Sequence, residues 1–198
     1  MTIQYNSIDF HTFVDEELKN KQCRIIRITK ELMQERIDEI ANFVNSIRSE
    51  YRYEYGWELE NREYFLNDLV DKWKYSFAIV NENNMFYLIN FSSIYNNLIH
   101  NHCTYTLQAK RSSDLAKLHM LKLCQSGLDN GFTILEGYFP KNNNGSIALH
   151  LKMGWEIQSI RNYKEVLLQA NIEKVRNSTY DLIIHSKRCN YELSERRL

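Results

Sequence analysis

Long apolar runs are absent from this 198-residue chain, and so is an excess of charge of either sign. Lysine plus arginine amounts to 25 residues and aspartate plus glutamate to 25, so the formal net charge is zero. A neutral chain lacks the positive field that draws proteins to nucleic acids or anionic membranes. No apolar run approaches the roughly 20 residues of a membrane-spanning helix, and the first residues show no basic-then-apolar signal pattern. We therefore expect a cytoplasmic protein that binds neither nucleic acid nor membrane.

Glycine, proline and cysteine are also scarce, with six, one and four residues respectively. So little glycine and proline argues against a long flexible linker. The cysteines are Cys23, Cys103, Cys124 and Cys189, and they form neither a C-x-x-C pair nor a metal-ligand spacing. We therefore expect reduced thiols and no metal site.

The length indicates a single domain. A chain of this size buries about 70% of its unfolded surface, which is enough for a hydrophobic core. We predict a leader over residues 1–23 that packs on the domain, the domain itself over 24–187, and a charged tail over 188–198. The sequence does not distinguish a monomer from a homodimer.

Hydrophobic periodicity predicts strands and helices that interleave along the chain. The predicted strands cover residues 24–28, 76–80, 85–94, 100–107, 133–139, 155–160 and 180–185. The predicted helices run from a cap at Thr29 to Ile47, from a cap at Asn61 to Trp73, over 113–129 and over 145–153. Hairpins come early and helical crossovers late, which predicts an α/β (α+β mixed) fold: a mixed sheet with helices on both faces.

The segment from His100 to Trp155 is the most informative part of the chain. Its first half carries a basic turn, Arg111-Ser112-Ser113-Asp114-Leu115-Ala116, which opens a helix ending at Gly131. Free backbone N–H groups and the helix dipole favour an anion at such a helix N-terminus. Its second half places Asn143, Ser146, Leu149, His150, Lys152, Gly154 and Trp155 at regular spacings after the next strand. An ordinary capped helix with basic neighbours is the alternative interpretation of residues 110–117.

This order and spacing resemble the GNAT superfamily of acyl-CoA-dependent N-acyltransferases, firmly over residues 100–155 and loosely over 24–185. The family's turn has the pattern Arg/Gln-x-x-Gly-x-Gly/Ala, so Asp114 stands where glycine is usual. The resemblance implies a central, mostly antiparallel twisted sheet and acyl-CoA (acetyl-CoA or a short-chain acyl-CoA) as cosubstrate. The residues that it implies for cofactor binding are Thr104, Thr106, Lys110, Arg111, Ser112, Ser113, Asp114, Leu115, Ala116, Asn143 and Ser146.

His100 and His102 are the candidate catalytic bases. Two residues apart on a strand, they share one face, and imidazole titrates near neutrality. Arylalkylamine N-acetyltransferases carry His-x-His on this strand, nine residues before the turn arginine, and His102 precedes Arg111 by nine residues. The resemblance implies that these histidines take the amine proton through water. A structural strand histidine is the alternative.

Two further roles come from register with the family. His150 stands where the family usually has a tyrosine that protonates the departing CoA thiolate. The backbone N–H of Thr104 should polarise the thioester carbonyl where its strand splays from its neighbour. A solvated surface histidine is the alternative for His150.

The acceptor site is predicted from aromatic and amide side chains. The aromatic run Tyr51, Tyr53, Tyr55 and Trp57 offers stacking surface for a ring. Asn96 and Asn97 offer neutral hydrogen-bond groups, and Glu136 is a second candidate base. The alternatives are core aromatics, turn-forming asparagines and a paired strand carboxylate.

Together these residues predict an enzyme that moves an acyl group from acyl-CoA to the primary amine of a small polar molecule. A nucleotide-linked amino sugar is the leading acceptor. Direct attack without an acyl-enzyme is expected, because Cys103 should alternate away from the histidine face. Three alternatives remain open: a degenerate domain that senses acyl-CoA without turnover, an arylalkylamine or polyamine N-acetyltransferase, and an enzyme that uses an acyl carrier protein as donor.

Overall fold

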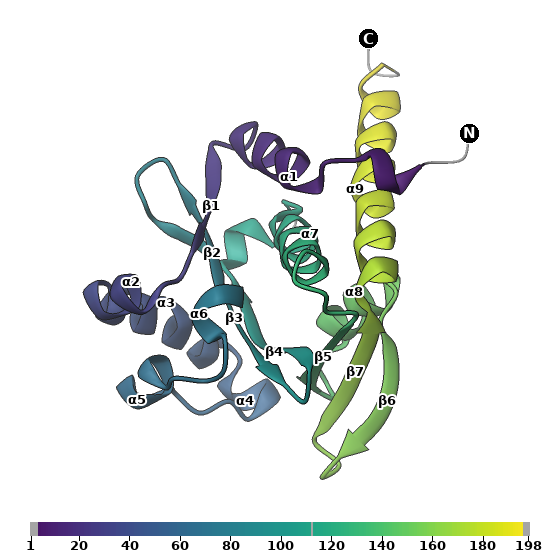
Figure 1. The fold of residues 1–198 in the computed structure, drawn as a ribbon. Helices are drawn as coiled ribbons and strands as arrows, with labels where there is room; N and C mark the ends of the chain where they lie inside the picture. Colours follow the sequence, from purple (N-terminus) through teal and green to yellow (C-terminus); the bar gives the residue numbers. More distant parts are fainter. Residues whose placement is uncertain (1–3, 112, 196–198) are drawn as a thin grey trace.

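A single seven-stranded sheet organises the molecule in the computed structural model, which describes residues 4–111 and 113–195, with side chains up to Arg188. Its strands are β1 (Cys23–Arg27), β2 (Phe77–Asn81), β3 (Phe86–Tyr95), β4 (Leu98–Thr106), β5 (Ile134–Pro140), β6 (Glu156–Arg161) and β7 (Glu165–Asn171). Their spatial order is β1-β2-β3-β4-β5-β7-β6, and only the β4–β5 pair is parallel (Figure 1). The predicted mixed, mostly antiparallel sheet is confirmed.

Helices cover both faces of this sheet, as predicted (Figure 1). On one face lie α2 (Lys30–Glu35), α3 (Ile37–Glu50), α4 (Arg52–Tyr55) and α5 (Arg62–Leu66). On the other lie α1 (Phe10–Lys19), α7 (Leu115–Leu128) and α9 (Ile172–Glu195). Short elements complete the order: η1 (Tyr5–Ser7), α6 (Lys72–Tyr75), η2 (Gln108–Lys110) and α8 (Asn144–Lys152). None of the helices so described is long and apolar enough to cross a bilayer.

The first predicted helix is divided in two at Arg36. Thr29 caps α2 as predicted, accepting a bond from the Leu32 N–H at 3.2 Å. Arg36 then leaves the helical region, with φ −114° and ψ 23°. Its guanidinium bonds the Asn84 carbonyl at 2.8 Å and lies 4.2 Å from the centre of the Phe86 ring. These contacts with the β2–β3 turn fix the bend, which no periodicity in the sequence indicates.

The second predicted helix is shorter than expected. Asn61 does cap α5, accepting from the Tyr64 N–H at 3.0 Å, but α5 ends at Leu66. The Lys72 ammonium donates to the carbonyl oxygens of Phe65 at 2.9 Å and Asn67 at 3.0 Å. A buried lysine thus satisfies the carbonyls that a continued helix would have bonded.

The strand predicted over Tyr180–His185 is wrong, because these residues belong to α9. Ile172, Val175, Thr179 and Ile183 are buried, and their spacing of three to four residues is helical. Strand β7, whose Val166, Leu168 and Ala170 alternate inward, was not predicted. The tail boundary predicted at residue 188 falls within α9.

The predicted leader contains helix α1, which packs against α9. Phe10, Val14 and Leu18 of α1 are buried. The Tyr180 ring of α9 lies 5.6 Å from that of Phe10, and the Tyr5 hydroxyl bonds Asp181 at 2.6 Å. Two segments separated by about the whole length of the chain therefore form one core cluster with α7.

Candidate functional site

The β4 and β5 strands pair over two residues and then separate. Parallel pairing joins Ile99 to Leu135 and His100 to Glu136, and no later pair follows in these described strands. A Cβ atom on Gly137 would lie 2.9 Å from the Asn101 carbonyl oxygen, so only glycine allows this approach at the point of separation. Beyond it the edge of β4 is open toward α8.

A pocket of about 400 Å³ lies at this opening. It is lined by β4, the turn before α7, the start of α8 and the aromatic segment after α3. The lining residues are Ile47, Tyr51, Tyr55, Trp57, Thr104, Tyr105, Thr106, Arg111, Ala116, Asn143, Gly145, Ser146, Leu149 and His150. The structure therefore brings together Thr104, Thr106, Arg111, Ala116, Asn143 and Ser146, all predicted for the cofactor. Sequence reasoning missed Ile47, Tyr105, Gly145 and Leu149.

The turn before α7 is suited to an anion. Asp114 precedes the helix with φ 63° and ψ 2°, the left-handed conformation that glycine adopts without cost. Its side chain makes no capping bond, and among the residues that the structure describes no other side chain bonds the first N–H groups of α7. The carboxylate pairs instead with the ammonium of Lys117. Asp114 thus reproduces the backbone of the usual glycine but adds a negative charge beside the helix start.

Replacing Asp114 should strengthen anion binding at this turn. Asp114→Asn removes the charge and releases Lys117, and asparagine tolerates left-handed backbone better than most residues. We expect CoA to bind roughly threefold to tenfold more tightly, since a charge near a surface contributes about 1 kcal/mol at contact distance. Asp114→Gly should do at least as well, because it also removes backbone strain. Titration calorimetry with CoA measures both, and weaker binding in both variants would mean that the carboxylate helps.

Arg111 ties the turn to the aromatic segment. Its guanidinium lies 4.8 Å from the centre of the Tyr51 ring, bonds the Tyr51 hydroxyl and approaches Glu50 at 3.6 Å. Tyr51 stacks on Tyr55 at 5.0 Å, and both meet Trp57 edge to face. Three members of the predicted aromatic run, Tyr51, Tyr55 and Trp57, therefore form a wall of the pocket next to the turn before α7.

Several predicted residues do not line this pocket. Tyr53 is 99% exposed, because α4 turns it away from Tyr51 and Tyr55. Lys110 lies over the Tyr87 ring at 4.4 Å, and the Ser113 hydroxyl bonds the Lys110 carbonyl. Leu115 is buried in the core with α1, and Ser112 lies outside the described residues.

Asn96 and Asn97 are also far from the pocket. They form the turn between β3 and β4, with φ 47° and 60°, at the opposite end of β4 from Thr106. Both side chains are exposed. The turn-forming interpretation is therefore the one that the structure favours, since asparagine is the non-glycine residue best suited to left-handed turns.

His150 lines the pocket but is poorly suited to donate a proton. Its Nδ1 lies 2.8 Å from the Ser146 carbonyl oxygen, which only accepts, so Nδ1 carries the hydrogen. Its ring packs between Phe139 at 4.5 Å and Trp155 at 5.1 Å. This burial lowers the pKa of His150 to about 4, so the ring is neutral and Nε2 has no proton to give. This geometry does not favour the predicted role as general acid, and the surface alternative is wrong because His150 is 7% exposed.

A conservative replacement of His150 tests this interpretation. His150→Phe keeps the aromatic packing and loses only the bond to Ser146. We expect kcat to fall by less than about tenfold, whereas loss of a general acid would cost roughly 10²–10⁴. His150→Ala is the contrasting variant, because the cavity it leaves should cost about 2–4 kcal/mol of stability. A hundredfold loss of kcat in a stable His150→Phe protein would restore the acid role.

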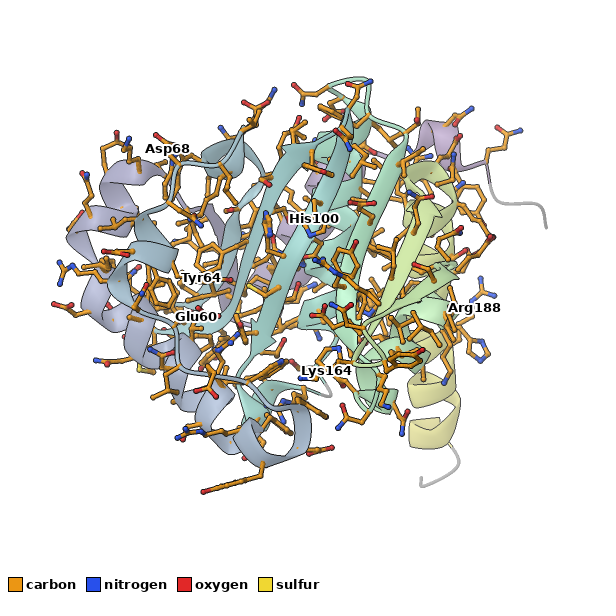
Figure 2. The ribbon with its side chains drawn as sticks, turned by 90° about the horizontal axis from the view of Figure 1, so that it is seen from below. Glu60, Tyr64, Asp68, His100, Lys164 and Arg188 are labelled. Atoms are coloured by element: carbon orange, nitrogen blue, oxygen red, sulfur yellow. The ribbon has the colours of Figure 1, made fainter. Side chains whose placement is uncertain are left out.

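The two strand histidines lie together on the face of the sheet that carries α2 to α5. Asn101 pairs with Ser92 and Cys103 with Phe91, so His102 is an extra residue, a β-bulge. The rings of His100 and His102 lie 4.7 Å apart. Figure 2 shows His100 on the strands of the sheet, with Tyr64 of α5 to one side of it.

Glu136 is the partner of His100. Its Oε1 lies 2.9 Å from His100 Nδ1, and both side chains are largely buried. A carboxylate only accepts, so the hydrogen sits on Nδ1 and Nε2 is left as a proton acceptor. Glu136 therefore orients His100, and of the two interpretations the geometry favours the paired strand carboxylate over a second base.

His102 is held neutral by its surroundings. Burial, the neighbouring His100 and the charge of Lys72 together lower its pKa to about 4. Its Nε2 lies 2.7 Å from the Ser93 hydroxyl. Lys72 is 3% exposed, and burial lowers its own pKa to about 8. This buried ammonium was missed, because a lysine in a polar stretch gives no sequence signal of burial.

Cys103 lies on the histidine face, contrary to prediction. The bulge at His102 interrupts the alternation of side chains, so Cys103 joins Tyr105 in the core under α3. Its sulfur lies 3.6 Å from the Tyr64 hydroxyl, and burial raises the pKa of the thiol to about 11. Such a thiol stays protonated and is a poor nucleophile.

The backbone of Thr104 faces the opening. Leu107 donates its N–H to the Tyr87 carbonyl at 2.9 Å, so Tyr87 and every second residue after it turn their backbone groups toward β4. Asn90 therefore turns its own groups toward β2. Thr104 is the partner of Asn90, so its N–H points away from β3, toward the side from which β5 has separated.

Comparison with solved structures identifies the fold. No protein-family model matches the sequence, and no curated protein matches it. An acetyltransferase of the GNAT family from Staphylococcus aureus Mu50 matches with a TM-score of 0.63 at 10% identity, covering 76% of this chain and 99% of that one. PaiA N-acetyltransferase from Thermoplasma acidophilum, in complex with coenzyme A, matches with a TM-score of 0.62 at 12% identity, covering 75% and 98%. The ribosomal-protein-S18-alanine N-acetyltransferase from Escherichia coli matches with a TM-score of 0.59 at 12% identity, covering 76% and 94%. The chain has the GNAT fold, as predicted.

Proposed function

We propose that the protein is an acyl-CoA-dependent N-acyltransferase that acts on the primary amine of a small polar molecule. The observation that carries this proposal is the opening between β4 and β5, which has an anion-binding turn at one end of β4 and a proton acceptor at the other. At one end, Arg111 and the uncapped start of α7 favour a pyrophosphate. At the other, His100 and Glu136 offer a proton acceptor. Likeness in fold to structures named as acetyltransferases, one of them solved with coenzyme A, supports the proposal.

The open edge of β4 suits the pantetheine arm. Thr104 and Thr106 line the pocket between the turn and the histidines, and an amide-bearing arm can pair with a free strand edge as a peptide does. Asn143 and Ser146 flank it from α8. Bound acyl-CoA supplies an activated thioester carbonyl. The Thr104 N–H, directed into the opening, is the donor we assign to polarise it.

His100 is the better of the two bases. An alkylammonium has a pKa near 10, so transfer of its proton to an imidazole with a pKa of about 4, such as His102, is strongly uphill. Glu136 stabilises the imidazolium that His100 would become, as a carboxylate does for a catalytic histidine. We assign proton acceptance to Nε2 of His100, directly or through one water molecule. A thiol of pKa about 8.5 can leave as thiolate, so the step does not depend on His150.

The acceptor that we propose is a polar, ring-bearing amine, with a nucleotide-linked amino sugar as the first candidate. Neutral polar groups next to the histidine pair support a polar acceptor: the Ser93 hydroxyl and the Tyr138 side chain, whose ring lies 5.7 Å from that of His100. Arylalkylamines and polyamines are the competing acceptors. A non-catalytic acyl-CoA sensor is the second candidate function. It is favoured by two departures from the family pattern: Asp114 stands where glycine is usual, and His150 stands where tyrosine is usual.

Binding of CoA should stabilise the protein against heat. At a hundred times its dissociation constant a ligand contributes about 2.7 kcal/mol, which corresponds to a rise in Tm of several degrees. Differential scanning fluorimetry with acetyl-CoA, longer acyl-CoAs and adenosine as a control measures the shift. Arg111→Gln should reduce it. The absence of any shift with every CoA thioester would reject the proposed cofactor.

Turnover separates the enzyme from the sensor. Acetyl-CoA and longer acyl-CoAs should be assayed by mass spectrometry with nucleotide-linked amino sugars, arylalkylamines and polyamines. Transfer to any amine excludes the sensor. Binding without transfer to any amine supports it, and transfer only to arylalkylamines or polyamines rejects the sugar.

A further inference from the structure

A buried cluster of polar side chains lies under the bulge of β4, on the face of the sheet opposite the histidines. Its members are Ser76, Asn90, Ser92 and Asn101, each at most 5% exposed. They lie among the apolar residues that pack the sheet against α7, where a polar group is costly unless its hydrogen bonds are complete. Neither periodicity nor the resemblance to a family predicts them.

Asn90 is the centre of this cluster. Its Nδ2 donates to Asn101 Oδ1 at 2.7 Å and to the Cys103 carbonyl oxygen at 2.9 Å, and lies 3.1 Å from Thr104 Oγ1. Its Oδ1 accepts from the Ser92 hydroxyl at 3.0 Å. These partners fix the orientation of the amide. In the reversed orientation the Asn90 Oδ1 atom would lie against the Cys103 carbonyl oxygen, and neither atom could donate a hydrogen.

The bond to the Cys103 carbonyl acts on the next residue as well. In a trans peptide the carbonyl and the N–H point in opposite directions. Because Asn90 holds the Cys103 oxygen on the β3 side, the N–H of Thr104, in the same peptide unit, is directed toward the opening between β4 and β5. The β3–β4 ladder gives this N–H the same direction, and the Asn90 amide adds a second hold on the peptide next to the bulge at His102, where the ladder is interrupted.

We propose that Asn90 is a positioning residue, which holds the Cys103–Thr104 peptide so that the Thr104 N–H meets the thioester carbonyl of acyl-CoA. This inference rests on the proposed acyl transfer. It differs from a merely structural role in one respect: through the Thr104 N–H, Asn90 affects the acyl carbonyl of the cosubstrate and not the binding of its CoA moiety. Its loss should therefore impair the reaction far more than the binding of free CoA.

Two variants of Asn90 test the proposal. Asn90→Asp keeps the shape but replaces the donating NH₂ by an oxygen, and Asn90→Thr keeps one donor. Ser76→Ala is the matched control, because Ser76 is equally buried and bonds Ser92 but does not contact the Cys103 carbonyl. We expect kcat to fall on the order of 10- to 100-fold in Asn90→Asp, less in Asn90→Thr, and by under about twofold in Ser76→Ala.

Infrared spectra of acetyl-CoA labelled with ¹³C at the thioester carbonyl give the decisive readout. The carbonyl stretch should move to lower frequency on binding to the wild-type protein and to Ser76→Ala, and this movement should be lost in Asn90→Asp. The dissociation constant of free CoA should stay within about twofold in all variants. An unchanged carbonyl shift in folded Asn90→Asp protein overturns the proposal. If wild-type protein neither binds acetyl-CoA nor transfers its acyl group, the proposed function itself fails.

Discussion

Replacing His100 by alanine should lower kcat/KM at pH 7 by roughly 10²–10⁴-fold, the range that a general base contributes. The expectation follows from the Glu136 carboxylate at 2.9 Å, which fixes the tautomer and leaves Nε2 free to take a proton. The loss should shrink toward pH 10, where more of the amine is already neutral and needs no base. Steady-state rates from pH 6 to 10, with CoA binding measured in parallel, give the comparison.

The matched variants rank the neighbouring groups. Glu136→Gln keeps the size of the side chain and removes only the charge beside the His100 ring. It should therefore lower kcat/KM less than His100→Ala does. His102→Gln should lower kcat/KM least of the three variants, since the low pKa of His102 makes it a weak base. If His102→Gln is the most damaging, or if the loss in His100→Ala is the same at every pH, His100 is not the base.

Replacing Lys72 by methionine should destabilise the protein, with a cost that depends on pH. At pH 7 three carbonyl oxygens, those of Tyr64, Phe65 and Asn67, lose their donor, and we expect a cost of about 2–3 kcal/mol. Lys74→Met on the same short helix is the control, because Lys74 is exposed and should change stability by under about 0.5 kcal/mol.

The sign of the pH dependence follows from the low pKa of Lys72 in the folded state. Between about pH 8 and pH 10.5 the folded protein has released a proton that the unfolded chain still binds. Stability of the wild-type protein relative to Lys72→Met should therefore rise across this window, by on the order of 3 kcal/mol. Urea unfolding at intervals of half a pH unit measures it, and a flat difference would show that the ammonium is not buried in solution.

The sequence was most informative where side chains follow a regular period. The strands β2 and β3, the caps at Thr29 and Asn61, and the helix end near Gly131 were all predicted close to their observed positions. The order of elements from residue 100 to 155 was predicted well enough to identify the fold. These features depend on local chemistry, which one sequence contains.

The errors come from interactions between distant residues. Tyr180 to His185 suits a strand by composition, and only the buried stripe facing α7 makes it helical. The bulge at His102 depends on pairing with Phe91 and Ser92, so alternation along β4 could predict neither the position of Cys103 nor the bond between Asn90 and its carbonyl.

For the site, register with the family predicted residues that line one pocket, but it did not predict the direction of side chains. Arg111, Ala116 and Asn143 were predicted and line the pocket. Tyr53 and Asn97 were chosen for their chemistry and lie on exposed surfaces, because a motif does not specify which way a short helix or a hairpin faces.

The packing of α1 on α9 has a consequence for synthesis on the ribosome. The contacts of Tyr5 and Phe10 with Asp181 and Tyr180 can form only after these partners have been translated, more than 160 residues later. At about 5–20 residues per second this interval lasts roughly ten seconds or more, during which the apolar stripe of α1 can pack on α7 and the sheet but not on α9. The nascent chain should therefore be a chaperone client until α9 emerges, and shortening α9 should reduce soluble yield before it affects chemistry at the distant pocket.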